Sequence, residues 1–489
     1  MKITKELFRW QRSENEAEAP LPVSAYGYFG DAWRRFLAQG TSRASLAVIA
    51  LIALFSLLVP VFVKRSDTAM DPYYAKLPPR ISVGGASLVR GEVRRRLGDE
   101  GLSRLIGIGI GAGEEYSPII EIGEADGATR LVRLDGYLEV GFVYKSLTEE
   151  EYERMSAWER ETGRKIFYPL IADNEFNPDP GDANMWYKAR GGLALAEVGG
   201  EYVGVHPSPD MKILDNYMRG EGGEPIYAIP FGGGSGSARA VRTRVLYHNY
   251  YLYQNGTEPS YLLGTDSQGY DLALRTAGGI RVSLILAIGV SFINLVIGAL
   301  VGAVEGYFGG AVDLILERVT DVLSGVPFIV VATLFQIYLS DRVGAIPSLL
   351  FAFVLTGWLG TANRVRGQFF RYKSAEYVLA AKTLGVKDGR IIWRHIFPNT
   401  LGTLITASAL VIPGVIFTES MLSFLGIVNL GREGVTSLGT LLSDASGIWV
   451  NYPHLMIVPA AVISLFMISF NLIGNGLRDA FNPEMKGGV

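Results

Sequence analysis

The sequence predicts an all-α membrane protein with six transmembrane helices and an inserted extracytoplasmic α+β domain. Charged residues make up only 19% of the 489 residues and hydrophobic residues 49%, whereas a soluble protein carries about a quarter of its residues as charges. Six apolar segments approach the length of about 20 residues that a membrane-spanning helix needs. A polar stretch of roughly 200 residues separates the first two segments, and its composition is that of a folded domain.

Composition also excludes several classes of protein. The net charge is only −3 and apolar residues are abundant, so the chain is not intrinsically disordered. The same near-neutral balance argues against nucleic acid as a partner, because nucleic-acid binders carry a strong basic excess. The chain has no cysteine, which rules out a disulfide scaffold and cysteine-based metal or nucleophile chemistry.

The six predicted spans follow one another with short connections, except after the first. They lie at about 46–63, 282–304, 326–339, 346–359, 401–420 and 456–473. The third and fourth are short and close together, so a re-entrant pair is an alternative for them. The resulting domains are a cytoplasmic segment 1–43, the first helix 44–63, an extracytoplasmic insertion 64–262, and a core 263–489 with five further helices.

Basic residues in the loops set the orientation. The loop between the fourth and fifth spans, residues 361–400, carries eight Lys or Arg, while the loops at 341–345 and 426–452 carry almost none. Short basic loops remain on the cytoplasmic side. We therefore expect this loop and both termini in the cytoplasm of a bacterial or archaeal plasma membrane, with residues 64–262 outside.

The inserted segment contains patterns of both strands and helices. Alternating apolar residues predict strands at 105–110, 119–122, 130–144 and 200–206. A helix is predicted over 148–162, where Ser146 or Thr148 can cap it ahead of a run of Glu. Residues 177–182 predict a turn that separates strands, and the glycine-rich segment 231–238 is typical of a linker.

No constellation of catalytic or metal-ligating residues stands out. A phosphate-binding GxxxxGK[ST] loop is absent, so the chain is not expected to hydrolyse ATP or to be an enzyme. The four histidines are scattered without the spacing of metal ligands. We therefore expect no metal and no cofactor in this chain.

The basic loop carries the most informative pattern. A helix-forming run ends at Gly385, which suits a left-handed residue after a helix. A second short helix is predicted from 387 to 396, closed by Pro398. Apolar residues beside Arg390 and Arg394 make this piece amphipathic, so it can lie on the membrane or enter a groove of another protein. A juxtamembrane basic anchor is the plainer alternative.

At these residues the sequence resembles the permeases of ABC importers. Ala380-Ala381, Gly385 and Phe397-Pro398 are similar to the EAA loop of that family, which forms a coupling helix docked on a cytoplasmic ATPase. Residues 263–271 (LGTDSQGYD) resemble a signature of the C-type permease of oligopeptide and dipeptide importers. Similar blocks follow at 281–284, 306–310, 422–426 and 471–480, and together they cover about 262–485.

The resemblance implies a fold, partners and a site. The fold is that of six-helix ABC-importer permeases. The partners are a second permease, two cytoplasmic ATPases that hold ATP and Mg, an external solute-binding protein and membrane lipid. The ATPase-coupling residues it implies are Glu376, Ala380, Ala381, Gly385, Lys387, Arg390, Trp393, Arg394 and Pro398.

The chain also departs from the family pattern. The Glu of EAA is Leu379 here, although Glu376 lies about one helical turn earlier. Tyr270 replaces an Arg of the signature. The 200-residue insertion exceeds the short connection expected between the first two spans, and the resemblance says nothing about its role. A docking platform for the binding protein, a cap over the outer mouth and a structural elaboration are the alternatives, and its position favours the platform.

Few large polar side chains fall at membrane depth. These translocation-path candidates are Asn294, Gln336, Glu419 and Asn471. Polar groups inside a membrane usually face a bundle interior or a water-filled path. Helix–helix hydrogen bonding is the alternative role for each. Small residues at 289, 298, 302, 408 and 414 permit close helix packing.

Two rival functions are weaker. A secondary transporter predicts charged residues deep in the spans and paired broken helices, and the sequence has neither feature. A membrane-anchored enzyme or sensor predicts clustered catalytic residues within 64–262, and none is evident. The expected function is therefore a permease subunit of an ATP-driven importer, with oligopeptides or dipeptides as the solute that the resemblance favours.

Overall fold

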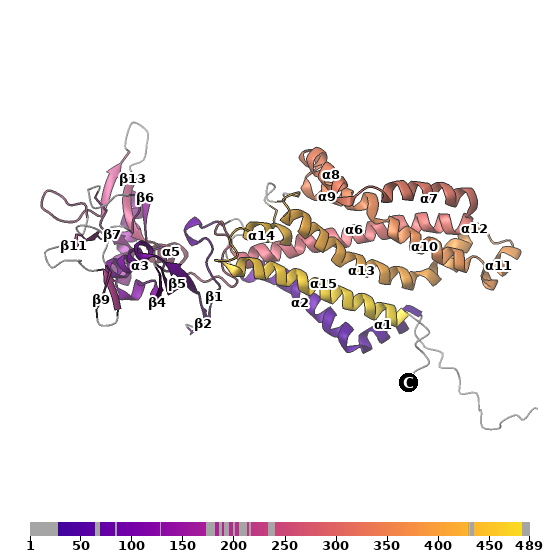
Figure 1. Ribbon diagram of the computed structural model, residues 1–489, viewed down its shortest axis with the longest axis horizontal. Helices are drawn as coiled ribbons and strands as arrows, with labels where there is room; N and C mark the ends of the chain where they lie inside the picture. Colours follow the sequence, from indigo (N-terminus) through magenta and orange to yellow (C-terminus); the bar gives the residue numbers. More distant parts are fainter. Residues whose placement is uncertain are drawn as a thin grey trace, which may run out of the picture. The chain divides into compact units, whose positions relative to one another are not determined.

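A computed structural model gives the fold (Figure 1). It describes residues 28–481 except 64–68, 84–85, 128, 173–180, 185–187, 190–194, 199–200, 205–212, 215–216, 233–239, 429 and 431–434. The predicted turn at 177–182 falls partly outside the described residues, and most of the glycine-rich segment 231–238 does as well.

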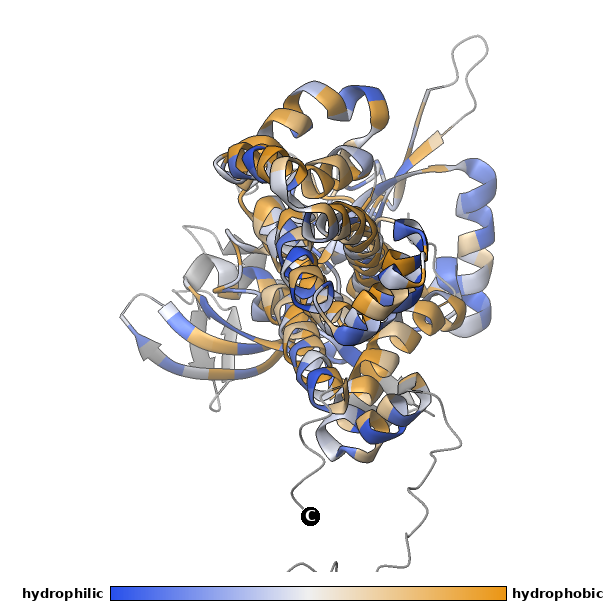
Figure 2. Cartoon of the chain, turned by 90° about the vertical axis from the view of Figure 1, so that its right-hand side faces the viewer, coloured by the Kyte–Doolittle hydropathy of each residue, from blue (hydrophilic) through white to orange (hydrophobic). Residues whose placement is uncertain are grey.

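Long apolar helices correspond to the predicted spans. Within the described residues five helical segments are long and apolar enough to cross a membrane, or six if a bent pair counts as one span. They are α2 (Gly40–Phe62), α6 (Leu272–Phe308), α9 (Ala345–Gly357) continued by α10 (Leu359–Tyr372), α13 (Phe397–Phe424) and α15 (Pro453–Phe481). Figure 2 shows these long helices largely in the colour of hydrophobic residues.

The bent pair occupies the place of the third predicted span. It consists of α7 (Gly310–Ser324) and α8 (Phe328–Val343), which meet at 75°. The predicted segment 326–339 corresponds to α8 alone. Only 16 residues long, α8 is shorter than a full span requires, so α7 is needed to complete one.

Contacts divide the described residues into two units. The helical unit lies within Met1–Ile52, Leu284–Thr418 and Ser464–Val489, and the mixed unit within Ala53–Ser283 and Glu419–Ile463. Four of the long helices, α2, α6, α13 and α15, continue from one unit into the other. The α+β domain and the adjoining ends of these helices make up the mixed unit.

Glycines let two helices of the helical unit approach closely. Gly298, Gly302 and Gly306 recur every four residues on α6 and face α10. A Cβ atom at Gly302 would lie 2.3 Å from the carbonyl oxygen of Ala362, and one at Gly298 would lie 2.6 Å from Cβ of Thr361. Small residues at this spacing form one stripe of a helix, so backbone meets backbone there. Of the other predicted packing positions, Ser408 accepts a hydrogen bond from Ser291 through its carbonyl, whereas Gly289 and Gly414 have open space.

Two antiparallel segments, 76–80 and 261–266, form a neck that joins the α+β domain to the helix ends of the mixed unit. The backbone N–H of Lys76 donates to Asp266 O (2.8 Å), and that of Arg80 donates to Tyr261 O (2.9 Å). The hydroxyl of Thr265 links the two segments again, because it accepts from Leu77 N at 2.8 Å. The beginning and the end of the insertion therefore lie side by side.

The inserted residues form an α+β domain with two main sheets. One sheet has the order β3-β5-β4 and is covered by α3; the other has the order β12-β13-β6, with β7 paired to β13, and carries α4 and α5. Their bounds are β3 (Glu92–Leu97), α3 (Asp99–Ala112), β4 (Ile119–Asp126), β5 (Thr129–Asp135), β6 (Phe142–Thr148), α4 (Glu149–Thr162), β7 (Phe167–Tyr168), β12 (Ala228–Phe231), β13 (Ala240–Leu246) and α5 (Tyr247–Asn255).

Smaller elements complete the domain. A hairpin of β1 (Arg80–Val83) and β2 (Ala86–Arg90) follows the neck, and short antiparallel pairs join β8 (Lys188–Ala189) to β11 (Ile213–Leu214) and β9 (Leu195–Val198) to β10 (Glu201–Gly204). Thr148 caps α4 by accepting from Glu151 N, as the sequence predicts, and Gly163 follows the helix with φ +71°. Strands are also found within 119–122 and 200–206.

Two predictions for this domain are wrong. The alternating segment 105–110 lies in helix α3, because Leu102, Leu105 and Ile106 pack at helical spacing onto Val132 and Leu134 of the sheet. The predicted strand 130–144 is two strands, β5 and β6, joined by a tight connection through Gly141 at φ +62°. Tertiary packing overrides a local apolar alternation in the first case.

Candidate functional site

The basic loop folds into two short helices with a glycine turn between them. The first, α11 (Glu376–Thr383), starts after extended Ala375 and ends at Leu384. Gly385 then takes φ +75°, and its N–H donates to Lys382 O at 3.0 Å. This left-handed residue is the helix stop that the sequence predicts, and a residue with a side chain would be strained there.

The second helix runs into the next span without a break. Helix α12 (Asp388–Ile391) is followed by a π turn at Ile392–Ile396, and α13 begins at Phe397. Pro398 therefore does not close the short helix, contrary to the sequence prediction. It occupies the first turn of α13, where proline is tolerated.

One face of the loop packs on the helices of the bundle. Val378 and Ala381 of α11 and Ile391 of α12 are buried together with Tyr307 of α6 and Phe369 of α10. Of the two alanines in the predicted motif, Ala381 belongs to this buried face and Ala380 is exposed. Ala381 is only 6% exposed, so a larger side chain there would add volume to a packed core.

The opposite face of the loop is exposed and mixes cations with large apolar groups. Trp393 is 53% exposed and Leu384 83%. The other exposed residues of this face, which we call the coupling surface together with Trp393 and Leu384, are Glu376, Ala380, Gly385, Lys387, Arg390, Arg394 and Pro398. Exposed aromatic and Arg side chains around an apolar centre are the typical composition of a protein–protein contact.

Two contacts that the sequence did not predict fix this loop to α6. The hydroxyl of Tyr307 donates to the carboxylate of Asp388 at the start of α12. The ammonium group of Lys373 donates to Gly306 O at 3.0 Å. Tyr307 and Gly306 belong to the GYFGG block at the end of α6, and Asp388 adjoins predicted Lys387. The signal was therefore present in the sequence, but only as two separate blocks.

The polar residues at membrane depth are engaged within the protein. Asn294 is buried and donates to Phe353 O at 3.4 Å, and Gln336 donates to Ala345 O at 2.9 Å, so both join α9 to a neighbouring helix. Asn471 is exposed and donates to Met467 O of its own helix at 2.7 Å. These geometries favour helix packing over solute contact for Asn294 and Gln336.

Glu419 lies in the mixed unit inside a cage of hydroxyl groups. Its side chain is fully buried and accepts from Ser283 of α6 at 3.2 Å and from Ser423 at 3.1 Å. Ser437, which caps α14 (Leu438–Ala445), also hydrogen-bonds this carboxylate. Glu419 therefore ties the ends of α6 and α13 to α14.

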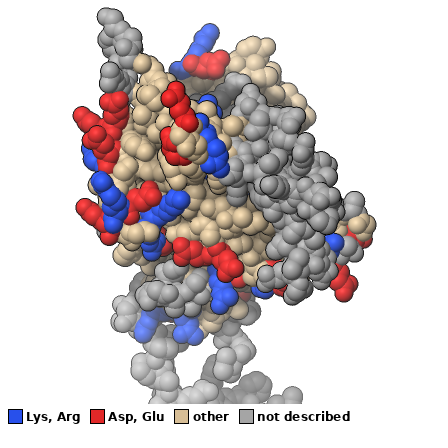
Figure 3. Space-filling model, turned by 90° about the vertical axis from the view of Figure 1, so that its left-hand side faces the viewer, with Lys and Arg blue, Asp and Glu red and all other residues tan. Residues whose placement is uncertain are grey.

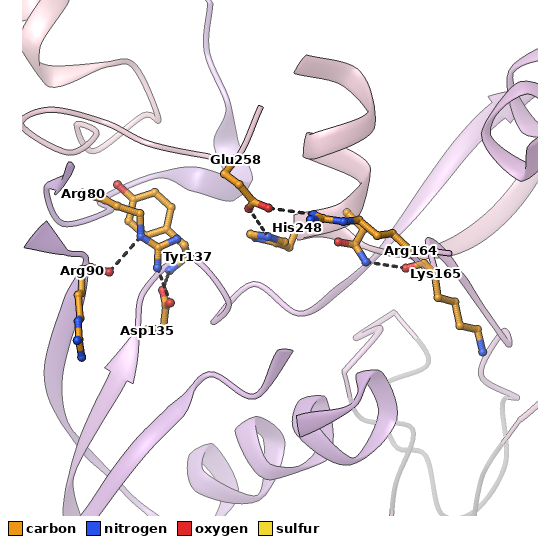
Figure 4. Close-up of polar contacts among 9 residues, drawn as sticks. Arg80, Arg90, Asp135, Tyr137, Arg164, Lys165, His248 and Glu258 are labelled. Carbon is orange, nitrogen blue, oxygen red and sulfur yellow. Dashed lines mark hydrogen bonds and ion pairs between the residues drawn. The ribbon is translucent and has the colours of Figure 1, made fainter. Parts of the chain in front are cut away.

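The α+β domain carries two polar clusters of its own (Figure 4). Glu258 accepts from His248 Nε2 at 2.7 Å and from Arg164 Nη1 at 2.9 Å. These partners, the histidine first, lower the pKa of Glu258 to about 2. In the second cluster the guanidinium of Arg80 pairs with Asp135 and lies 4.0 Å from the ring centre of Tyr137. Figure 3 shows cations and anions interspersed over the described face of this domain.

Comparison with known proteins places the chain in a family. Residues 294–487 match the model described as binding-protein-dependent transport system inner membrane component, and residues 27–79 match the N-terminal TM domain of oligopeptide transport permease C. Residues 80–293, with nearly the whole α+β domain, lie between the two matches.

Individual relatives agree with the family models. The chain is 37% identical over 224 residues to the oligopeptide transport system permease protein OppC of Bacillus subtilis, and 42% over 228 residues to OppC of Haemophilus influenzae. These matches cover 46% of this chain and 72% and 71% of the relatives. A dipeptide transport system permease protein, DppC of Lactococcus lactis, is 39% identical over 46% of this chain and 64% of its own length.

The fold and these relatives define the class of protein as a helical membrane permease. More particularly, the chain belongs to the family of binding-protein-dependent transport system inner membrane components, as a C-type permease of the oligopeptide and dipeptide transport group. A solved structure of the MetNI methionine ABC transporter also matches, with a TM-score of 0.35 and 14% identity over 42% of this chain and 94% of that one.

Proposed function

We propose that this chain is the permease subunit of an ATP-driven importer of oligopeptides or dipeptides in a bacterial inner membrane. It forms the translocation path with a second permease and receives peptide from an external solute-binding protein. Two cytoplasmic ATPases supply the energy, since the chain itself has no phosphate-binding loop. ATP and Mg bind in those subunits. Support comes from the peptide permeases among its relatives.

The observation that carries the proposal is the two-faced loop at 376–399. Its buried face is packed on α6 and α10, and its coupling surface is exposed and suited to a protein partner. An element held firmly on one side and docked on the other can pass a movement of the ATPases to the bundle. The bond between Tyr307 and Asp388 ties the loop to a helix that crosses the membrane.

The mechanism needs two states that a ligand distinguishes. ATP closes the two ATPase subunits, the coupling surface moves with them, and α6 and α13 carry the movement through the membrane. The pair of permeases thereby opens first to one side and then to the other. In this arrangement Lys387, Arg390 and Arg394 contact acidic groups of the ATPase, and Trp393 fills an apolar part of its cleft.

Co-purification and uptake test the proposal together. We expect both ATPases to co-purify with the wild-type chain from native membranes and to be lost from Leu384→Glu and Trp393→Ala, because both residues are exposed at the coupling surface. Gly385→Pro should act in the same way by distorting the turn, since proline cannot adopt φ +75°. Peptide uptake by the reconstituted complex should fall in parallel.

Arg318→Glu is the matched control for Arg390→Glu. Arg318 is an exposed arginine of α7 outside the coupling surface, paired with Asp321 at 2.9 Å. Arg318→Glu should leave the co-purification of the ATPases unchanged, while Arg390→Glu should reduce it. If wild-type chain from native membranes brings down no ATPase, the loop is only a basic anchor and the proposal is wrong.

A further inference from the structure

One cavity of the α+β domain has no role in the proposed coupling. It measures about 580 Å³ and lies in the mixed unit, where the neck, β3, α3 and the loop before α15 meet. Ligand-binding pockets for small molecules have volumes of about 300–1,000 Å³. The cavity therefore has the size for a ligand of a few amino acid residues.

The lining of this cleft carries charges of both signs. Its cationic groups are Lys76, Arg95 and Arg104, and its carboxylates are Glu139 and Asp182. Arg95 pairs with Glu139, and Arg104 Nε lies 3.5 Å from Asp182 Oδ2. Burial raises the pKa of Glu139, and its neighbours Arg95 and Arg104 oppose that shift. Three cations against two carboxylates leave one positive charge in excess.

Lys76 supplies this excess charge. No carboxylate lies within salt-bridge distance of its ammonium group in the described part of the chain. That group lies 5.5 Å from the ring centre of Tyr452, and the guanidinium of Arg95 lies 5.2 Å from the same ring. Two cations thus converge on one tyrosine at the cleft wall, which favours an anion between them.

The backbone of Lys76 is held in an unusual conformation. Among the described residues it is the one residue other than glycine with a positive φ, at +63°. Its N–H is bonded to Asp266 O, and the next residue is bonded to Thr265, so the neck fixes this geometry. Glycine or asparagine would fit the position with less strain. Non-glycine residues held in this backbone region cluster at functional sites, where strain is retained for function.

We propose that this cleft binds a short peptide by its carboxylate end, with Lys76 as the principal anion-binding residue and Arg95, which faces the same ring of Tyr452, as the second cation. The carboxylates of Glu139 and Asp182 face the amino end, and Tyr73, Tyr144 and Tyr452 offer aromatic surfaces to the side chains. A zwitterionic peptide matches a cleft that has both signs of charge and one surplus cation. This inference rests on the proposed function for its substrate class, and it places a peptide site in the inserted domain.

Binding of radiolabelled trialanine to the full chain in nanodiscs, without any partner subunit, tests the proposal. Trialanine amide, which lacks the terminal carboxylate, is the matched ligand. We expect the wild-type chain to bind trialanine about ten-fold more tightly than the amide, as befits one charge-assisted hydrogen bond. Lys76→Asn keeps a residue that tolerates positive φ and removes the charge, so it should abolish this preference, and Lys76→Arg should restore it.

Lys165→Asn is the control within the same domain. Its ammonium group also lies near a tyrosine ring, 4.7 Å from the centre of Tyr168, but outside the cleft, and the preference should survive this change. Equal affinity of the wild-type chain for trialanine and its amide would overturn the proposal, as would a preference that persists in Lys76→Asn. If Lys76→Asn weakens binding of the solute-binding protein but not of trialanine, the cleft is a protein-docking surface and the proposal is also wrong.

Failure of the cleft and failure of the proposed function are separable. Suppose that the assembled complex takes up peptide with ATP but the isolated chain shows no preference for the terminal carboxylate. The proposed peptide site is then wrong, and the proposed importer function stands. Suppose instead that the isolated chain shows a carboxylate preference that depends on Lys76, but the assembled complex takes up no peptide. The proposed importer function is then wrong, and the proposed peptide site stands.

Discussion

The hydrogen bond between Tyr307 and Asp388 joins the second span to the loop that we propose to contact the ATPase. A hydrogen bond to a charged group contributes about 1.5–3 kcal/mol, so its loss should loosen the loop without unfolding it. We predict that Tyr307→Phe lowers ATP-driven peptide uptake by about 3- to 10-fold while ATPase subunits still co-purify.

Tyr377→Phe provides the comparison for this prediction. Tyr377 is exposed on α11, and its hydroxyl accepts only from Asn399, at 3.2 Å, among the described contacts. This variant should retain uptake. The prediction is wrong if the two substitutions reduce uptake equally, since a general loss of tyrosine hydroxyls would then explain both.

Glu258 makes the stability of the α+β domain depend on pH. Its folded-state pKa of about 2 lies below the ordinary value of 4.5, so its stabilising contribution is complete above pH 4.5 and is lost as the pH falls toward 2. We predict that Glu258→Gln lowers the thermal midpoint of the full chain in detergent at pH 6. The difference from wild type should narrow steadily between pH 4.5 and pH 3. A difference that stays constant over this range would show that charge is not its source.

At the scale of elements, the contact between α6 and α10 depends on glycine. A side chain at Gly302 meets the backbone of Ala362, whereas Gly289 on the same helix has open space. We predict that Gly302→Leu costs about 1–3 kcal/mol by overpacking and lowers the thermal midpoint by several degrees. Gly289→Leu should change it little. Similar shifts for both variants would contradict the packing argument.

The spans could be predicted because each one is a continuous apolar segment whose backbone bonds are internal. The bent pair α7–α8 was not predicted, because α7 carries Asp313, Glu317, Arg318 and Asp321 and is therefore not a continuous apolar segment. The prediction of a strand at 105–110 was wrong because local alternation does not show how a segment packs. Its alternation fits a strand locally, but Leu102, Leu105 and Ile106 reach the same sheet when the segment is helical.

The candidate site was predictable in its outline and not in its contacts. Gly385 and the basic residues of the loop mark the coupling surface in the sequence. Which side chains of the loop are buried and which are exposed is known only from the structure. Pro398 was misplaced because proline is permitted both after a helix and in the first turn of one. The partnership of Tyr307 with Asp388 joins residues 81 positions apart, which a local pattern cannot reveal.

At the scale of the whole molecule, the orientation in the membrane can be measured with ease. The chain has no cysteine, so single-cysteine variants need no background substitutions. Glu153→Cys and Leu384→Cys both introduce a thiol at an exposed position, one in the α+β domain and one in the coupling surface. We predict that a membrane-impermeant maleimide labels the first in intact cells and the second only after permeabilisation. The reverse pattern would contradict the orientation that the basic loop predicts.

Removal of the α+β domain tests whether it serves as a docking platform. Arg80 and Tyr261 are hydrogen-bonded partners, so an Asn-Gly turn in place of residues 81–259 can keep the backbone pairing of the neck. We predict that the shortened chain still binds the ATPases but binds the solute-binding protein about ten-fold more weakly, as expected when part of an interface is lost. Unchanged affinity for the solute-binding protein would exclude the platform.

The hydrogen-bonded segments of the neck have a consequence for how such a chain can arise. Because the insertion leaves and re-enters the permease at adjacent backbone positions, the first two spans need not move to accommodate 200 residues between them. A single genetic event at that junction can add a domain, remove it or exchange it for another. The neck is therefore a natural site for grafting a foreign domain onto this transporter.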